Sequence, residues 1–401
     1  MALVPVAEAL ERLLDGASPL PGERIPLTDA AGRVLAEPVI ALRTQPPFNA
    51  SAMDGYAARS EDVASAPARL SVIGMAPAGR GFGGSLGRAE AVRIFTGAPL
   101  PEGADTIVIQ ENIRDLGNGH VEVMEPTAKD RNIRRRGLDF SKGDLLLDRG
   151  RMLDPAALSL AASANHPVLG VVRRPMVAII ATGDELVAPG SEPGPDQIIS
   201  SNAYGVAAAA RSVGARALDL GIAADRKEDI AALVRKAVAI GADVIVTLGG
   251  ASVGDHDLIH DVLTGEGMKL DFWKIAMRPG KPLMFGRLGR IRCIGLPGNP
   301  VASLVCSQLF LKPLLARLGG RDHRQDIRAA RLGAPMQAND LRQDYVRAVV
   351  NDDSGTLVAT PFSIQDSSML RTLADANGLI VREPFAPAAK AGDECHVLML
   401  R

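Results

Sequence analysis

The chain has 401 residues, of which 47% are hydrophobic, 23% are charged and only 3% are aromatic. This composition is typical of a globular protein, and the length predicts about two to four domains. The 45 Lys and Arg residues nearly balance the 46 Asp and Glu residues. The weak overall field argues against a general binder of nucleic acid or anionic membranes, so an anion site would need a local cluster of cations.

The three cysteines are Cys293, Cys306 and Cys395. Their spacing matches neither a zinc-binding pattern nor a disulfide-rich secreted framework, so we expect reduced core residues. Residues 1–16 combine acidic side chains with an amphipathic pattern, which differs from a signal peptide. No apolar stretch approaches roughly 20 residues without charges, Gly or Pro. We therefore expect no transmembrane helix and a cytoplasmic location.

Three sequence textures follow one another along the chain. Residues 20–172 are rich in Gly, Pro and short Val, Leu and Ile runs, which indicates β structure without alternating helices. From about 173 to 320, strand-like and helix-like segments alternate, which predicts a parallel α/β sheet. The expected strands are 177–181, 215–221 and 243–248, with helical spacing at 230–238. From about 326 to 401, short alternating runs predict a small β-barrel or sandwich.

Two strand-to-helix turns in the α/β segment are candidates for ligand binding. GGASVGDHD follows the strand at 243–248, and PGNP leads into an apolar helix predicted at 301–318. Open α/β folds bind ligands at the carboxyl ends of parallel strands, so we expect the pocket there. The Gly-rich turn suits a phosphate, although such a turn is often purely structural. Asn299 before Pro300 could likewise be only a helix cap.

Three cations surround a Pro-Gly turn in FWKIAMRPGKP, namely Lys274, Arg278 and Lys281. In a nearly neutral protein such a cluster can surround a dianion, and molybdate and phosphate both fit that description. The alternative is a solvated basic turn, because surface charges are usually only hydrated. The basic run at 132–137 is interpreted as a solvated loop.

Acidic residues complement these cations, and the candidates are Asp54, Asp184, Glu185, Asp225 and Asp257. Mg²⁺ typically binds one or two carboxylates together with substrate phosphates, so these acids favour metal-assisted phosphate chemistry. Asp225 also has a structural alternative, because Asp225 and Glu228 have the spacing of a helix capping box. Spacing does not decide between the two roles.

A transition-metal site at His256 and His260 is a further alternative. The two residues are four positions apart on a predicted helix. A zinc site needs three or four ligands, and the sequence offers no evident third partner. We therefore interpret both histidines as surface residues.

Eight segments in a characteristic order carry a resemblance to a known family. They are PPFNASAMDGYA (46–57), FTGAPLPEGAD (95–105), NIRRRGLDF (132–140), ATGDEL (181–186), LGIAAD (220–225), TLGGASVGDHD (247–257), FWKIAMRPGKP (272–282) and GLPGNPVAS (295–303). Together they resemble the molybdopterin molybdenumtransferase family, which includes the E domain of gephyrin. The segment 367–381 matches more loosely.

The resemblance implies a multidomain α/β protein. A central parallel-sheet domain that binds molybdopterin would be joined by β-rich N-terminal domains and a C-terminal β-barrel. The implied domains are a split N-terminal linker domain (1–45 and 140–172), a β-rich domain contributing to the active-site cleft (46–139), the α/β domain (173–322) and the barrel (323–401). It also implies an elongated homodimer whose active site is shared between subunits.

The activity implied by the resemblance is Mg²⁺-dependent insertion of molybdate into adenylylated molybdopterin, with release of AMP. Carboxylates would hold Mg²⁺ and water against the pyrophosphate, while cations would hold molybdate near the dithiolene sulfurs. The implied partners are molybdopterin adenylyltransferase and molybdoenzyme clients, in transient contacts, with no nucleic acid and no membrane.

The resemblance also assigns site residues. The implied catalytic residues are Asp54, Thr96, Glu185, Asp225 and Asp257. The implied substrate- and molybdate-binding residues are Lys274, Arg278, Lys281, Arg134, Gly249, Gly250, Ser252, Gly254, Pro297 and Asn299. The implied metal ligands are Asp184, Glu185, Asp225 and Asp257, and Asp139 would lie near the cleft.

The chain departs from the family pattern at a few positions. The family often has Asp-Asn at Asn49-Ala50 and Glu-Asp at Leu138-Asp139, so the roles of those positions are in doubt. Arg278 stands where some members have Lys. This chain therefore has a planar guanidinium at a position where those members have a compact ammonium group.

Other functions remain as alternatives to the transferase. A molybdopterin adenylyltransferase shares the α/β domain and its GGxSxG turn, but its members lack the extra N- and C-terminal regions. A non-catalytic molybdopterin-binding scaffold would have lost site residues, whereas the acidic and basic positions here are occupied. A nicotinamide dehydrogenase is disfavoured because its glycine fingerprint and the acid that follows are missing.

Overall fold

The computed structural model describes residues 3–249 and 258–401. The chain forms two compact units, and each is described by itself. One unit comprises Met1–Glu23, Gly32–Ala36 and Val171–Arg401, and the other comprises Arg24–Ala31 and Glu37–Gly170. The first unit contains the predicted α/β segment and the C-terminal strands.

The second unit is built mainly on β structure, as the Gly- and Pro-rich sequence predicts. Its largest sheet has six strands in the order β7-β4-β6-β5-β9-β8. Their bounds are β4 Gly55–Ala58, β5 Ala68–Ala76, β6 Glu90–Ile94, β7 Thr106–Ile109, β8 Ile113–Gly117 and β9 His120–Val123. Further along, helix α2 (Pro155–Ser163) begins at Asp154, whose side chain accepts a hydrogen bond from the Ala157 N–H as an N-cap.

The α/β unit contains a six-stranded sheet in the order β16-β13-β17-β21-β20-β18. The strands are β13 Met176–Thr182, β16 Arg216–Ala223, β17 Val244–Leu248, β18 Lys269–Trp273, β20 Met284–Leu288 and β21 Ile291–Leu296. β16, β13, β17 and β21 run parallel, as predicted. One edge of the sheet is antiparallel, because β20 pairs antiparallel with both β21 and β18. Only two residues separate β20 from β21, and so short a connection requires antiparallel strands.

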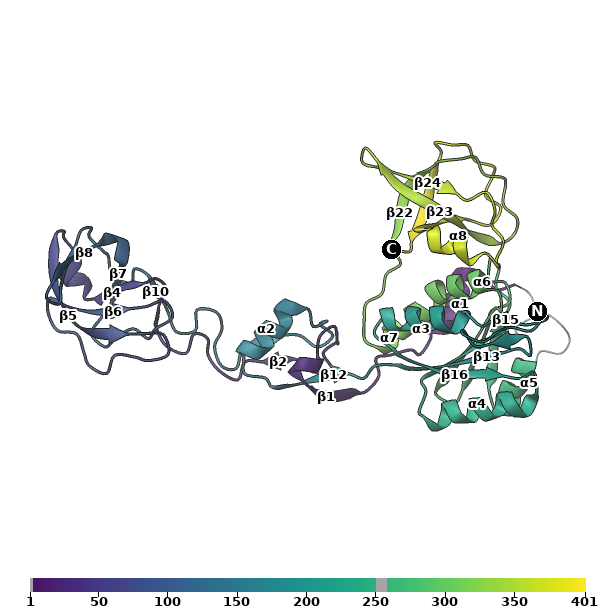
Figure 1. Ribbon diagram of the computed structural model, residues 1–401, viewed down its shortest axis with the longest axis horizontal. Helices are drawn as coiled ribbons and strands as arrows, with labels where there is room; N and C mark the ends of the chain where they lie inside the picture. Colours follow the sequence, from purple (N-terminus) through teal and green to yellow (C-terminus); the bar gives the residue numbers. More distant parts are fainter. Residues whose placement is uncertain (1–2, 250–257) are drawn as a thin grey trace. The chain divides into compact units, whose positions relative to one another are not determined.

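Helices cover both faces of this sheet (Figure 1). Their bounds are α1 Val6–Leu14, α3 Asn202–Ser212, α4 Lys227–Ala239, α5 Leu258–Gly265, α6 Pro300–Cys306 and α7 Lys312–Leu318. Val177 and Ile179 of β13 share one apolar core with buried residues of α1, α3, α6 and α7. Ala178 and Ile180 share another with α4 and α5. Successive strand residues therefore enter opposite layers, which explains the continuous apolar run in the sequence.

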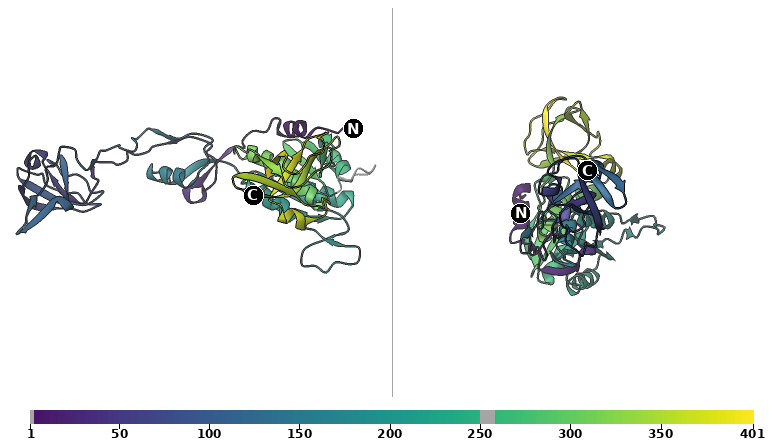
Figure 2. Two further views of the ribbon diagram at one scale, coloured as in Figure 1. Left: turned by 90° about the horizontal axis from the view of Figure 1, so that it is seen from above. Right: turned by 90° about the vertical axis from the view of Figure 1, so that its left-hand side faces the viewer.

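The C-terminal strands close into a barrel, one of the two architectures that the sequence predicts. The strands are β22 Ile327–Leu332, β23 Gln343–Asp353, β24 Thr356–Pro361, β25 Gly378–Arg382 and β26 Glu394–Met399. The pairings run β23-β24-β22-β26-β25, and β25 returns to β23. A short strand of the α/β segment, β19 (Met277–Arg278), joins the barrel beside β23. Figure 2 shows the barrel strands in yellow against the green helices of the same unit.

The helix predicted at 301–318 is present, with an irregularity at its centre. Ser307–Leu311 forms a π-helical turn, in which the Lys312 N–H donates to the Ser307 carbonyl. Pro313 follows. In a regular α-helix its ring would clash with the carbonyl four residues earlier, so the helix is distorted there. The stretch Pro300–Leu318 has the length and hydropathy of a membrane span, yet 78% of its most apolar 18-residue window is buried inside the protein, as in a core helix.

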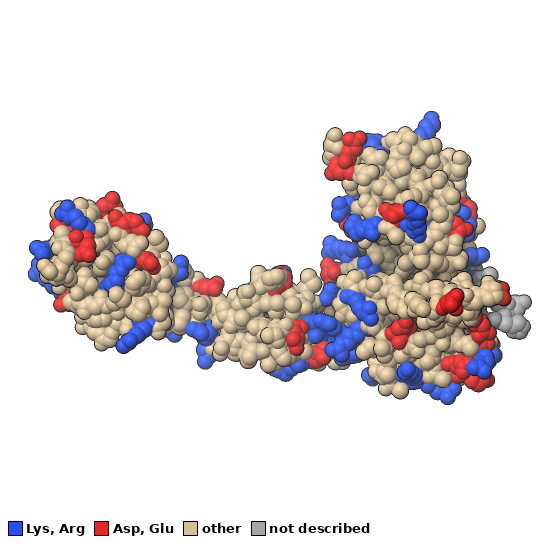
Figure 3. All heavy atoms as spheres, viewed as in Figure 1, with Lys and Arg blue, Asp and Glu red and all other residues tan. Residues whose placement is uncertain are grey.

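A further prediction about the chain, that its cysteines are reduced core residues, is confirmed. Cys293, Cys306 and Cys395 are buried and form no disulfide. Charged side chains of both signs are interspersed over the face shown in Figure 3, in keeping with a net charge of −1.

A partly buried ion pair lies at the amino edge of the α/β sheet. Both carboxylate oxygens of Asp243 accept from the Arg173 guanidinium, at 2.8 and 2.9 Å, and Oδ2 also accepts from the Met176 N–H at 2.8 Å. Asp243→Ala should lower the free energy of unfolding by about 2 kcal/mol, because three donors lose their acceptor. The measurement is urea denaturation followed by the fluorescence of Trp273, the only tryptophan.

The matched control is Asp229→Ala, which removes an exposed pair with Arg226. It should cost less than about 1 kcal/mol, since exposed ion pairs contribute little. Equal effects of the two substitutions would contradict the role given to Asp243.

Candidate functional site

A cleft of about 700 Å³ lies at the carboxyl edge of the parallel strands. The turns that follow β13, β17 and β21 contribute to it, and so does Asp225, which follows β16. The predicted site residues that line it are Glu185, Asp225, Gly249, Pro297 and Asn299. The structure thus brings together residues that are up to 114 positions apart, at the edge where the strand pattern predicts the pocket.

The acidic part of the site is formed by Asp184, Glu185 and Asp225. The Asp225 N–H donates to Asp184 Oδ1 at 3.0 Å. Partial burial, and then the negative charges of Asp184 and Glu185, raise the pKa of the Asp225 carboxyl, while a backbone hydrogen bond from Asp184 opposes the shift. The three carboxylates therefore create a locally negative potential that a cation would relieve.

The capping interpretation of Asp225 was wrong. Helix α4 begins at Lys227 with Arg226 in the N-cap position, and the Arg226 side chain makes no capping hydrogen bond. The chain between β16 and α4 is one residue longer than the capping box requires, so Asp225 is turned to the Asp184 loop instead.

Only some of the predicted metal ligands lie within the described residues. Within residues 3–249 and 258–401, no three His, Cys, Asp or Glu side chains are gathered closely enough to hold a metal ion. Asp257 lies outside the described residues, as do Gly250, Ser252, Gly254 and His256. His260 is described and stacks on Trp273, with ring centroids 5.1 Å apart.

Gly249 and Thr182 form the floor of the cleft between two strands. Gly249 has φ +93°, and a Cβ there would lie 2.8 Å from the Thr182 carbonyl oxygen, so only glycine fits. The Thr182 hydroxyl is buried and has no hydrogen-bond partner among residues 3–249 and 258–401. An unsatisfied hydroxyl in the lining of a cleft is suited to a ligand group, and the sequence analysis did not single it out.

The PGNP turn supplies another wall. Asn299 occupies the N-cap position of α6 as predicted, but its side chain makes no capping bond and donates instead to Ser367 Oγ at 2.8 Å. Asn202 donates to the Gly298 carbonyl at 2.7 Å. Asn202 and Ser368 line the cleft, although sequence reasoning missed both. Two sequence features could have indicated these residues. They are the Ser-Ser-Asn start of α3 for Asn202 and the loosely matching segment 367–381 for Ser368.

The three predicted cations differ in their surroundings. Lys281 is exposed, Lys274 is half-buried, and neither side chain has a hydrogen bond or ion pair within the described ranges. The Lys274 backbone has φ +93°, a conformation unusual for a residue with a side chain. Arg278 is paired with Asp344 of the barrel. Pro282, which follows Lys281, lines the cleft.

Asp54 and Thr96 lie together in the β-rich unit. Asp54 Oδ1 accepts from the Thr96 N–H at 2.8 Å and from its hydroxyl at 2.7 Å. These hydrogen bonds, aided by the nearby Arg93, lower the pKa of the Asp54 carboxyl. The pair is therefore an ionised acceptor held in a fixed geometry.

The neighbouring basic segment is held against the same loop. Arg134 lies on β10 (Ile133–Arg134), where it pairs with Ala50 of β3 (Ala50–Ser51), and its side chain is exposed. Asn49 accepts a hydrogen bond from the Arg136 N–H at 3.0 Å, which gives this departure a structural role. Leu138 is 66% exposed, and nothing in the structure explains that departure.

Three family models match the chain in sequence order. They are the MoeA N-terminal region (domain I and II) at residues 4–165, a probable molybdopterin binding domain at 178–317, and the MoeA C-terminal region (domain IV) at 329–400. The second match covers the strands and turns that form the cleft.

Curated relatives and a solved structure match at nearly full length. The chain is 37% identical to molybdopterin molybdenumtransferase 2 of Mycobacterium tuberculosis, over 89% of each chain. It is 34% identical to the molybdopterin molybdenumtransferase of Haemophilus influenzae, over 94% of this chain and 93% of the relative. A crystal structure of the molybdopterin biosynthesis moeA protein from Pyrococcus horikoshii superposes with a TM-score of 0.85 at 31% identity, covering all of both chains. The chain therefore belongs to the molybdopterin molybdenumtransferase family.

Proposed function

We propose that this protein is a molybdopterin molybdenumtransferase, which inserts molybdate into adenylylated molybdopterin and releases AMP. The observation that carries the proposal is the cleft, where carboxylates and strand-end turns meet beside a cation-bearing turn. Such a combination can bind an anionic substrate in the presence of a cation. Family membership supports the same reaction.

The acidic residues would contribute one or two ligands to a magnesium ion whose other ligands come from the substrate and water. Asp184, Glu185 and Asp225 provide the oxygen ligands that Mg²⁺ prefers, and a cation would offset the burial and the neighbouring negative charges that raise the pKa of Asp225. Asp257 would complete the set. When bound, the metal would neutralise charge on the substrate's pyrophosphate as its bond to AMP breaks.

The remaining cleft residues bind and orient the substrates. The Thr182 hydroxyl and Gly249 would contact the substrate's polar groups, and we propose substrate-binding roles for Gly250, Ser252 and Gly254 from the family resemblance alone. Lys274 and Lys281 would hold molybdate, since neither charge has an ionic partner within the described residues. Molybdate would thereby be held close to the dithiolene sulfurs, which bind the molybdenum in the product.

The direct test is incubation with adenylylated molybdopterin, Mg²⁺ and molybdate. We expect AMP and molybdenum cofactor to appear together and in equal amounts. Formation of adenylylated molybdopterin from ATP and molybdopterin would favour an adenylyltransferase instead. Binding of the substrate without either product would favour a non-catalytic scaffold.

The cellular setting belongs to the same proposal. We propose a cytoplasmic enzyme that contacts molybdopterin adenylyltransferase and molybdoenzyme clients transiently. The substrate is supplied by an adenylylating reaction, and the product is consumed by proteins that bind the cofactor.

Substitution of Asp225 separates catalysis from structure. Asp225→Asn should reduce the rate of AMP release at least roughly tenfold, because it removes a charged metal ligand. The melting temperature should change little, because Asp225 is mostly exposed and does not cap α4. The matched control is Glu228→Gln, which alters an exposed carboxylate in the next turn. Full activity of Asp225→Asn would exclude Asp225 from the reaction.

A shared active site predicts complementation between inactive variants. We propose that Asp54 and Thr96 of one subunit serve the cleft of the other, as the family resemblance implies. Mixing Asp54→Ala with Asp225→Ala under subunit exchange would then give heterodimers with one intact site. About half the dimers would be mixed, so activity should reach roughly a quarter of the parental rate. Heterodimers shown by differential tagging that remain inactive would contradict the shared site.

A further inference from the structure

The Pro-Gly turn beside the cleft is attached to the barrel through its backbone. β19 pairs parallel with β23, so Met277 lies opposite Gln343 and Arg278 lies opposite Asp344. The Gln343 N–H donates to the Ala276 carbonyl at 2.9 Å. The start of the turn therefore behaves as an extra strand of the barrel.

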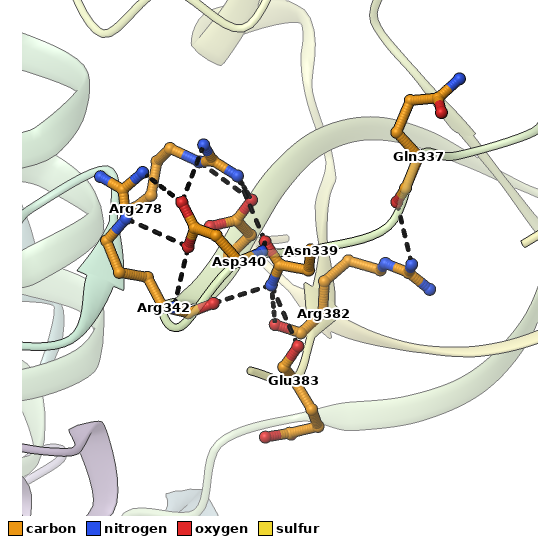
Figure 4. Close-up of polar contacts among 8 residues, drawn as sticks. Arg278, Gln337, Asn339, Asp340, Arg342, Arg382 and Glu383 are labelled. Carbon is orange, nitrogen blue, oxygen red and sulfur yellow. Dashed lines mark hydrogen bonds and ion pairs between the residues drawn. The ribbon is translucent and has the colours of Figure 1, made fainter. Parts of the chain in front are cut away.

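The Arg278 side chain strengthens this attachment. Its Nε donates to Asp344 Oδ2 at 2.9 Å, and its Nη2 donates to the same oxygen. Nη2 also donates to Asn339 Oδ1 at 3.2 Å, and Nη1 lies 3.8 Å from Asp340 Oδ2. Figure 4 shows Arg278 with Asn339 and Asp340. We call Arg278, Asn339, Asp340 and Asp344 the Arg278 cluster.

The barrel residues of the Arg278 cluster are themselves braced. Asn339 Nδ2 donates to three backbone carbonyls, those of Arg342 at 2.7 Å, Glu383 at 3.0 Å and Arg382 at 3.1 Å. Arg342 pairs with Asp340 at 2.7 Å, and its hydrogen bonds lower the pKa of the Asp340 carboxyl to about 2. The guanidinium of Arg278 therefore meets acceptors that are already fixed.

The charge of Arg278 is also compensated where it lies. Two carboxylates, Asp340 and Asp344, face two guanidinium groups, Arg278 and Arg342. Asp344 is only 8% exposed, so its charge is poorly screened by water. Arg278 consequently offers little net attraction to a dianion, in contrast to Lys274 and Lys281.

The other side of the turn is packed closely. Gly280 has φ +116°, and a Cβ there would lie 2.5 Å from Cys306 Sγ of α6. The Lys281 carbonyl accepts from the Ile275 N–H at 2.8 Å. The turn is thus held by α6 on one side and by the barrel on the other, just before Pro282 enters the cleft wall.

We propose that Asp344 is a positioning residue for the oxyanion site: it holds Arg278, and through it the turn that presents Lys281, and Arg278 does not itself bind the oxyanion. This inference rests on the proposed function. The barrel would then affect oxyanion binding indirectly, because the oxyanion does not itself touch Asp344 or Arg278.

The test is molybdate binding measured by calorimetry on the full chain. Asp344→Ala should weaken binding about tenfold, because the turn loses its anchor. If Arg278 were a direct ligand, the same substitution would free its charge and strengthen binding. The two models thus predict opposite signs, and unchanged or tighter binding by a folded Asp344→Ala protein overturns the proposal.

Arg278→Lys provides a second test that does not alter the buried carboxylate. Lys keeps the charge but loses the two-pronged hydrogen bond, so positioning predicts weaker molybdate binding while direct charge attraction predicts parental affinity. The Arg278→Ala/Asp344→Ala double variant should bind no more weakly than either single variant, because all three break one contact. Additive losses would overturn the proposal.

The steady-state readout separates positioning from general damage. In Asp344→Ala the KM for molybdate should rise about tenfold while kcat at saturation changes less than about twofold. The control Asp353→Ala alters an exposed carboxylate at the far end of β23 and should change neither. Absence of molybdate binding by the parent would count against the proposed function, whereas parental binding with an unaffected Asp344→Ala would count against positioning alone.

Discussion

The parallel pairing of β13 with β16 and β17, and of β17 with β21, brings the carboxyl ends of four strands to one edge of the sheet. All the cleft geometry depends on that pairing. Alternate residues of β13 enter two different apolar layers, so a shift of one residue would expose both sets at once. The register is therefore fixed by the core, and the turns that follow the strands inherit fixed positions. The ion pair between Arg173 and Asp243 adds a polar constraint at the opposite edge.

The electrostatic field in the site depends on which charged side chains already have an oppositely charged partner. Asp184, Glu185 and Asp225 are close together, and partial burial together with the charges of the other two acids raises the pKa of Asp225, so the group favours a cation. Arg278 has carboxylate partners, which leaves Lys274 and Lys281 as the cations of that segment without ionic partners within the described residues. Because the chain is nearly neutral overall, attraction of an oxyanion depends on this local imbalance more than on the field of the whole protein.

Much of the fold could be predicted from periodicity, while its exceptions depended on local chemistry. The apolar runs and the helical spacing predicted the parallel strands and their helices, since buried parallel strands require such runs. The antiparallel edge follows from the short turn at Gly289, and the π-helical turn follows from Pro313. The division into four domains stays a prediction, and α1 packs with the α/β core although it was expected in the linker domain.

The site was predictable where motif residues follow parallel strands, and less so where contacts cross domains. Glu185, Asp225 and Asn299 meet because they follow three such strands. By contrast, the partner of Arg278 is 66 positions later, and Ser368 reaches the cleft from the barrel. No spacing rule connects such residues, because only the packing of the barrel brings them together.

The central claim is that the substrate occupies the cleft at the carboxyl edge of the sheet, and hydrogen exchange tests it most directly. With adenylylated molybdopterin added, the backbone amides of 183–186, 224–226 and 298–301 should exchange more slowly, because these turns surround the cleft. The amides of β22 and β24, on the barrel, should be unaffected. Protection confined to segments outside the cleft turns, at saturating substrate, would contradict the account.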